Sequence, residues 1–198
     1  HSPSLLARYP QSFDDDWSTE AFGEFVLANR DEIIPIISSR KVQSNVVRRS
    51  AVLLPGLIES SRSFGGKPFV NVEIGASAGL TLLWNQYRYR YHSGAGDIEL
   101  GSPAFPWAVE VETEGNIAQV LDHGFPEIAA NVGIEIDRVD INDQDAIGWL
   151  RALIWPEHGD NRGLFDAAVK LVGSNPLDVR FGDALELLPD LFVELPDR

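Results

Sequence analysis

The sequence predicts an α/β fold in which a Rossmann-like sheet follows a helical N-terminal cap. Residues 68–80 read PFVNVEIGASAGL, an alternating apolar run that ends in a glycine-rich turn, and an amphipathic segment follows at once from Leu80 to Tyr87. Residues 1–62 contain no convincing strand. After the turn, short extended segments alternate with helical ones, which is typical of α/β proteins. We therefore expect a helical cap over residues 1–67 and a Rossmann-like cofactor-binding domain over residues 68–198.

The composition is that of an ordinary globular protein. The chain has 198 residues, 44% of them hydrophobic and 23% charged. It has no apolar run of the ~18 residues that a membrane span needs, and no basic segment followed by an apolar one at its N-terminus. There is no cysteine, which excludes disulfides and thiolate metal sites. We expect a cytoplasmic protein and assign no metal ligands.

The formal net charge of −14 lies almost entirely in the second part of the chain. Residues 1–67 hold eight basic and eight acidic residues, whereas residues 68–198 hold eight basic and twenty-two acidic ones. Such a surface repels phosphate backbones and anionic lipids, so we expect a small-molecule substrate and neither nucleic acid nor membrane as a partner. The run RYRYHSG at residues 88–94 has two arginines, too few for nucleic-acid stacking on an acidic domain, and predicts a strand that ends in a turn. The sequence does not predict the oligomeric state.

Helix and strand signals can be followed along the rest of the chain. A helix is expected from Ser18 to about Ile37, kinked at Pro35, and a second one from Val42 to about Ile58. The remaining expected elements lie after the glycine turn: short strands within 98–113, an extended segment at 133–141, helices at 146–155 and 162–172, a strand at 179–184 and a last helix from Leu185.

The glycine turn is open to three interpretations. Gly75, Ser77 and Gly79 are small enough to let main-chain N–H groups approach a polar ligand, as in a cofactor turn of the form E-x-G-x-S-x-G. The same residues contain G-x-S-x-G, the pattern of a nucleophile elbow with Ser77 as the attacking group. An elbow follows several earlier strands, and none is predicted here, so a cofactor turn is favoured. A simple capped helix start is the third possibility.

Glu73 indicates which cofactor the turn would accept. A carboxylate beside the turn repels a pyrophosphate and attracts a cationic amino group, such as that of S-adenosylmethionine. The methionine carboxylate of that cofactor then needs N–H donors or an arginine. Asp183, in a Gly-Asp pair after a later apolar stretch, suits the adenine amino group, although such a pair is also a common turn with a helix cap. Candidates for the carboxylate come from one basic patch, which is otherwise a solvated helix face: Arg40, Gln43, Asn45 and Arg49.

Four ordered blocks carry a resemblance to a known family. They are RKVQSNVVRR from Arg40, VEIGASAGLTLLWNQYRYRY from Val72, WLRALIWPE from Trp149 and FGDALELLP from Phe181. Together they resemble the bacterial domain-of-unknown-function 2332 family, which is regarded as similar to Rossmann-fold S-adenosylmethionine-dependent methyltransferases. The resemblance implies a methyltransferase-type sheet, S-adenosylmethionine as cofactor, and these site residues: Glu73, Gly75, Ser77, Gly79, Asp183, Arg40, Gln43, Asn45 and Arg49.

The chain departs from this family in two ways. The family typically has Thr-Asn-Glu where this chain has Ser44-Asn45-Val46, so a carboxylate is missing from the block. Family members are also longer at both ends, and this chain, which lacks methionine, shows three or four of the seven strands usual in a methyltransferase sheet. We therefore expect a chain truncated at its C-terminus, with part of the sheet.

The expected activity is methyl transfer to an unknown small acceptor. Tyr87, Tyr89 and His92 lie within reach of the turn as candidate bases, but each is more often structural, and no catalytic residue is assigned. The alternative is a binding or regulatory module of the same fold that transfers no methyl group. A serine hydrolase using Ser77 is the third and weakest expectation.

Overall fold

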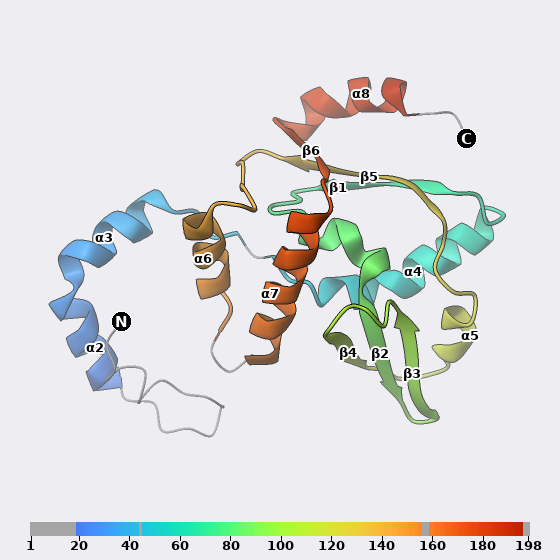
Figure 1. Ribbon diagram of the computed structural model, residues 1–198, viewed down its shortest axis with the longest axis horizontal. Coiled ribbons are helices and arrows are strands. Elements are labelled where there is room, and N and C mark those ends of the chain that lie inside the picture. Colours follow the sequence, from blue (N-terminus) through green and yellow to red (C-terminus); the bar gives the residue numbers. More distant parts are fainter. Residues whose placement is uncertain (1–18, 44, 156–158, 196–198) are drawn as a thin grey trace.

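The computed structural model describes residues 19–43, 45–155 and 159–195, and it has a mixed α/β fold with two small sheets (Figure 1). No helix in these ranges is long and apolar enough to cross a membrane. The helices are α2 Thr19–Ala28, α3 Arg30–Ser39, α4 Arg49–Ser63, the 3₁₀ helix η1 Leu80–Gln86, α5 Ala118–Leu121, α6 Gln144–Ala152, α7 Gly159–Ser174 and α8 Ala184–Glu194. The strands are β1 Phe69–Ile74, β2 Arg88–Ser93, β3 Gly96–Gly101, β4 Ala108–Glu112, β5 Ile128–Glu135 and β6 Asp178–Phe181.

The parallel sheet has the strand order β1-β5-β6. Val72 pairs with Val132, and Ile134 pairs with Arg180, so all three strands run the same way. Parallel neighbours need long crossover connections: β2, β3, β4 and α5 lie between β1 and β5, whereas α6 and α7 lie between β5 and β6. The carboxyl ends of the strands therefore meet at one edge, which in Figure 1 faces α6. The α/β class predicted from the sequence is confirmed.

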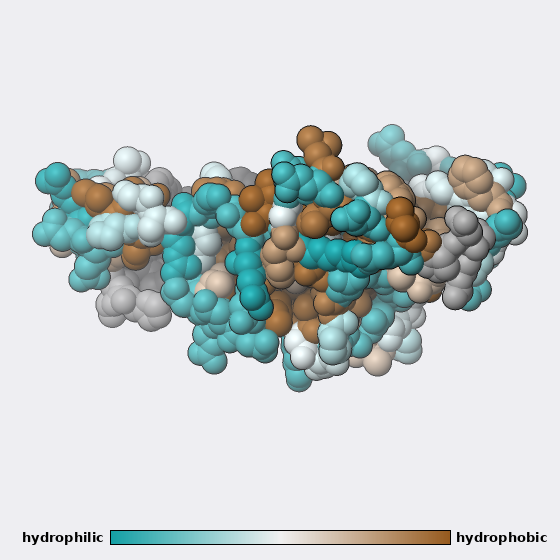
Figure 2. Space-filling model, turned by 90° about the horizontal axis from the view of Figure 1, so that it is seen from above, coloured by the Kyte–Doolittle hydropathy of each residue, from teal (hydrophilic) through white to brown (hydrophobic). Residues whose placement is uncertain are grey.

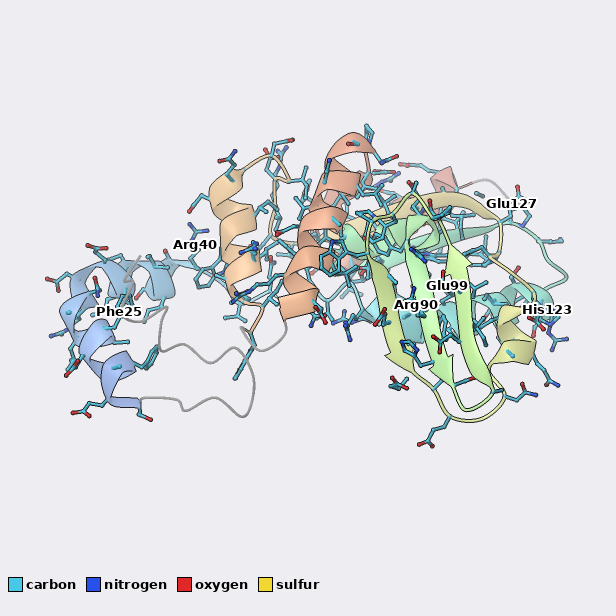
Figure 3. The ribbon with its side chains drawn as sticks, turned by 60° about the horizontal axis from the view of Figure 1, so that its bottom comes forward. Phe25, Arg40, Arg90, Glu99, His123 and Glu127 are labelled. Carbon is cyan, nitrogen blue, oxygen red and sulfur yellow. The ribbon has the colours of Figure 1, made fainter. Side chains whose placement is uncertain are left out.

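The mixed sheet has the order β3-β2-β4, with β2 antiparallel to β3 and parallel to β4. Alternation along β2 buries Tyr89 and Tyr91 and turns Arg90 outward. Arg90 forms ion pairs with Glu99 of β3 and Glu110 of β4, and Figure 3 shows Arg90 beside Glu99. The aromatic and basic run thus forms a strand, as predicted, and the structure adds that this strand is the central one, with its tyrosine rings in the core and its arginines paired.

Two apolar clusters enclose the parallel sheet. The larger cluster joins α4, η1, α7 and the tyrosines of β2, with Leu54, Leu80 and Phe165 fully buried. The smaller one packs Leu191 of α8 onto Val132 and Ile134 of β5. The parallel sheet therefore lies between α8 on one face and the main core on the other.

The N-terminal helices differ in their relation to the core. Helices α2 and α3 extend away from the body of the molecule at one end (Figure 1) and have no buried residue. Helix α4, in contrast, contributes Ala51, Leu54 and Ile58 to the main core. The expected division at residue 67 stays a prediction, and α4 shares its core with the later part of the chain.

Two expected helices take a different form. The helix expected from Val42 begins only at Arg49, because residues 40 and 41 bond to α6 and to the loop that follows β5. The segment expected as an amphipathic α-helix at 80–87 is the 3₁₀ helix η1, buried from Leu80 to Trp84. Two of its carbonyl groups accept hydrogen bonds from tyrosine hydroxyls: that of Leu80 from Tyr87, the residue that follows η1, and that of Trp84 from Tyr89 of β2.

A buried tyrosine compensates for the proline inside α4. Pro55 has no N–H group, so the carbonyl of Ala51, four residues earlier, loses its helical partner. The hydroxyl of Tyr91 donates to that carbonyl at 2.7 Å, and Tyr91 is 1% exposed. This bond ties α4 to β2 at the centre of the main core.

Replacing Tyr91 with Phe should lower the free energy of unfolding by about 1–3 kcal/mol, because the Ala51 carbonyl is left buried and unpaired. Pro55→Ala supplies a new N–H at the same place, so Tyr91→Phe should cost less in that background. Urea unfolding of both single variants and the double variant measures this coupling. Tyr89→Phe is the matched control, because its partner is the Trp84 carbonyl, and its effect should add to that of Pro55→Ala. Additive effects for Tyr91→Phe and Pro55→Ala would contradict the assignment.

Candidate functional site

The glycine turn lies at the carboxyl end of β1 and depends on left-handed backbone at three positions. The φ angles are 79° at Gly75, 51° at Ser77 and 73° at Gly79. Such values are uncommon for a residue with a side chain, so Ser77 is held there by its surroundings. The N–H groups of Gly75 and Ala76 donate to the Ile134 carbonyl at 2.8 and 3.2 Å, which fixes the turn to the end of β5.

Two glycines allow the turn to pack closely on its neighbours. A Cβ on Gly133 of β5 would lie 2.8 Å from the Cβ of Ala76, and one on Gly79 would lie 2.5 Å from a methyl group of Leu177. Both contacts are too short for any side chain. The turn is therefore pressed against β5 and against the chain that leads into β6.

Glu135, at the carboxyl end of β5, is the site residue that the sequence analysis missed. Its side chain accepts the Ser77 N–H at 2.6 Å through Oε2, and the N–H groups of Ile136 and Asp137 at 2.9 and 3.2 Å through Oε1. Glu135 is only 8% exposed, and a buried carboxylate needs such donors. An acidic residue at the end of the strand beside a glycine turn was the signal that could have found it.

Ser77 is buried, and its hydroxyl has no hydrogen-bond partner within the described part of the chain. A nucleophile elbow instead exposes its serine and places a base within hydrogen-bond reach. The buried, unpaired hydroxyl is a polar group that a ligand at the turn could satisfy.

Glu73 is a partly buried carboxylate with one firm partner. Thr81 Oγ1 donates to Glu73 Oε1 at 2.6 Å. Burial raises the pKa of Glu73, the Thr81 hydrogen bond and nearby Arg49 act in the opposite direction, and the neighbouring charge of Glu135 adds to the increase. The surroundings of Glu73 thus stabilise its charged form less well than water does.

Asp183 lies just beyond the end of β6 and caps helix α8. Its Oδ1 atom accepts the Leu185 N–H at 2.9 Å, and its side chain is exposed. The preceding Gly182 donates its N–H to the Glu135 carbonyl at 3.0 Å, so the ends of β5 and β6 are joined. The structure therefore brings Asp183, Glu135 and the glycine turn to the same edge of the parallel sheet.

The residues of the basic patch, which we call the upstream polar block (residues 40–49), lie in three different places. Arg40 forms an ion pair with Asp145 and lies over the Trp149 ring of α6, and Lys41 pairs with Asp137 just after β5. Arg49 is close enough to Glu73 to lower its pKa. Asn45 lines a cavity beside α6 and α7, and Gln43 is half-buried. Arg49 thus interacts electrostatically with Glu73, which belongs to the glycine-turn motif.

The three candidate bases have structural partners. The hydroxyls of Tyr87 and Tyr89 donate to the Leu80 and Trp84 carbonyls, and burial raises the pKa of both. His92 lies on the mixed sheet, where its Nδ1 atom is 2.9 Å from Asp97, and this contact raises its pKa. Of the three, Tyr87 lies near enough to Glu73 for the charge of that carboxylate to add to the increase in its pKa.

Exposed apolar side chains surround the carboxyl edge of the parallel sheet. Ile74 is 62% exposed, Ile136 71% and Phe181 43%, and each lies at or just after the end of its strand. Arg138 lies over the Phe181 ring, 5.4 Å from its centroid. Figure 2 shows that brown apolar residues also lie between teal hydrophilic ones on the face of the molecule that is seen from above. Apolar surface beside the buried polar side chains of Ser77 and Glu135 is a combination that small-molecule sites commonly offer.

Comparison with known proteins identifies the family. Residues 1–198 match the family described as an uncharacterized protein conserved in bacteria, domain of unknown function 2332. No curated protein and no solved structure matches the chain. Since the match extends over the whole chain, including the glycine turn, Glu135 and Asp183, the chain belongs to the domain-of-unknown-function 2332 family.

Proposed function

We propose that this chain binds S-adenosylmethionine at the carboxyl edge of the β1-β5-β6 sheet and transfers its methyl group to a small acceptor. The observation that carries the proposal is the Glu135 carboxylate, which lies against the N–H of Ser77 in the glycine turn. Doubly wound sheets bind nucleotide-type ligands at this place, with the turn on one strand and an acidic residue on the next. A Rossmann-like methyltransferase sheet is part of the same proposal.

Glu135 has the hydrogen-bonding capacity to hold a ribose. A carboxylate offers about four lone-pair positions, and three N–H groups occupy three of them. The remaining position on Oε2 suits a ribose hydroxyl, which would donate to it beside the turn. The donors from the protein hold the Glu135 side chain in one direction, so little rearrangement is needed on binding.

Glu73 and Ser77 would serve the amino-acid end of the cofactor. The charge of Glu73 is only partly stabilised in the free protein, so a cationic amino group gains more there than at an exposed glutamate. The Ser77 hydroxyl and Arg49 would hold the carboxylate. The exposed ring of Phe181 and the exposed alkyl group of Ile136 would lie against the adenine. The adenine amino group would donate a hydrogen bond to the Asp183 carboxylate.

The chemistry would depend on positioning. S-adenosylmethionine supplies an electrophilic methyl group on sulfur. The residues of the edge would orient that group toward the acceptor and exclude water. Correct orientation of the two reactants and avoided solvent reorganisation can remove a large part of the activation barrier in such transfers. No catalytic base is assigned, since the hydroxyls of Tyr87 and Tyr89 bond to backbone carbonyls and His92 bonds to Asp97.

Two other functions compete with this one. The first is a binding or regulatory module of the same fold, which would bind the cofactor without turnover. It is favoured by the hydrogen bonds that already occupy the candidate bases Tyr87, Tyr89 and His92. A serine hydrolase requires an exposed Ser77 with a base beside it, and the burial of Ser77 weighs against that function.

The wild-type chain should bind S-adenosylmethionine and S-adenosylhomocysteine in isothermal titration calorimetry. Glu135→Gln should weaken both by about ten- to a hundredfold, because a hydrogen bond to a charged group contributes about 1.5–3 kcal/mol. The 2′-deoxy form of S-adenosylhomocysteine should lose affinity in the wild type but little more in Glu135→Gln.

Glu127→Gln is the matched control for this experiment. Glu127 precedes β5 at the opposite end of the strand from Glu135, is exposed (Figure 3), and should leave both affinities unchanged. No binding of either ligand to folded wild-type protein would refute the proposal. Tight binding without methylation of any acceptor in a panel would favour the regulatory module.

Glu73 should make cofactor binding depend on pH. Burial raises its pKa, so the affinity for S-adenosylmethionine should fall as the pH is lowered through a range above that of an ordinary glutamate. Thr81→Val removes a hydrogen bond that stabilises the charged form, so the fall should begin at a higher pH. Calorimetry from pH 5 to pH 8 measures both profiles.

The same pKa shift predicts an opposite effect on stability. A raised pKa means that the folded state holds the proton more tightly, so the free energy of unfolding decreases as the pH rises through the folded pKa of Glu73. Glu73→Gln should therefore increase stability at neutral pH while it weakens cofactor binding. A variant that is less stable and binds normally would show that Glu73 has a structural role instead.

A further inference from the structure

A second candidate ligand site lies outside the glycine turn, between the upstream polar block and helices α6 and α7. It is a cavity of about 300 Å³. Four of its lining residues are buried and apolar: Val47, Leu150, Leu164 and Phe165. An apolar cavity of about 150 Å³ is enough to hold benzene, so this one can hold a substituted ring.

Two asparagines supply polar atoms that the protein leaves unpaired in this cavity wall. Asn45 Nδ2 and Asn161 Oδ1 are both buried and have no hydrogen-bond partner among the residues that the structure describes, and both residues line the cavity. They come from separate parts of the chain, one before α4 and the other in the first turn of α7. An unpaired buried polar atom is costly, and two in one cavity indicate a partner that the protein alone does not provide.

Together the two atoms define the partner by its hydrogen bonds. Asn45 offers a donor and Asn161 an acceptor, so the partner must both accept and donate while its body is apolar. A water molecule could satisfy the same atoms, but it occupies only about 30 Å³ of liquid volume and leaves the apolar wall uncovered. An alcohol or phenol meets both requirements, because a hydroxyl donates one bond and accepts another.

The geometry points to a binding site for a small, largely apolar alcohol or phenol in this cavity, with its hydroxyl donating to Asn161 and accepting from Asn45. The site goes beyond the cofactor edge and needs none of the residues proposed there. The binding proposed here is independent of the methyl transfer proposed above.

Three probes of similar shape separate the two hydrogen bonds: 4-ethylphenol, 4-ethylanisole and ethylbenzene. Their dissociation constants can be measured by ligand-observed saturation-transfer NMR on the 198-residue chain without cofactor. The phenol should bind at least about tenfold more tightly than ethylbenzene, which is the equivalent of one hydrogen bond of about 1.4 kcal/mol. The anisole, which accepts but cannot donate, should lie between them.

The variants test each asparagine separately. Asn161→Ala should reduce the preference for phenol over anisole to less than about twofold, and Asn45→Ala should reduce the preference for anisole over ethylbenzene in the same way. Asn175→Ala is the matched control, since Asn175 follows the other end of α7, bonds to the Leu171 carbonyl and does not line the cavity. Circular dichroism and thermal unfolding should show that all three variants fold.

Equal affinity for the three probes, no binding of any of them, or a phenol preference that survives both asparagine variants would overturn the inference. Glu135→Gln should leave 4-ethylphenol binding unchanged. Failure of cofactor binding and failure of the cavity site are therefore separate results.

Discussion

The hydrogen bond from the Ser77 N–H to Glu135 joins the parts of the molecule that matter most for its proposed function. It connects the turn after β1 to the end of β5, two segments that are 58 residues apart in the sequence. The left-handed backbone at Ser77 directs the N–H group toward the carboxylate, and the missing side chain at Gly133 lets the turn approach β5. Without this bond a buried carboxylate and a buried N–H group would each lose a partner, which is costly.

Both candidate sites contain polar groups that the protein itself does not fully satisfy. At the sheet edge, the protein satisfies Glu135 with its own donors but leaves the Glu73 charge and the Ser77 hydroxyl incompletely satisfied. In the cavity beside α7, two amide atoms are unpaired among apolar side chains. Each arrangement lowers the stability of the free protein and can be offset by a ligand of matching chemistry, which is how binding sites commonly differ from the rest of a core.

Local sequence patterns predicted the turn, β1, β2 and the Asp183 cap, because alternation, glycine spacing and a capping residue act over a few positions. Glu135 could not be recognised in that way, since its role depends on which strand pairs with β1. The start of α4 was placed too early because Arg40 and Lys41 are held by partners about a hundred residues away. The form of η1 also depends on a neighbour, since hydroxyls of Tyr87 and Tyr89 take its carbonyl groups. Tertiary contacts overrode local propensity in both places.

In the proposed function, the ends of β1, β5 and β6 form one ligand site organised by Glu135. Amide hydrogen exchange with and without S-adenosylhomocysteine tests it most directly, because each strand end reports separately. Residues 75–79, 135–138 and 182–185 should gain protection together, and all three should lose this response in Glu135→Gln. Protection confined to another region, or a response of the turn that is unchanged in Glu135→Gln, would contradict it.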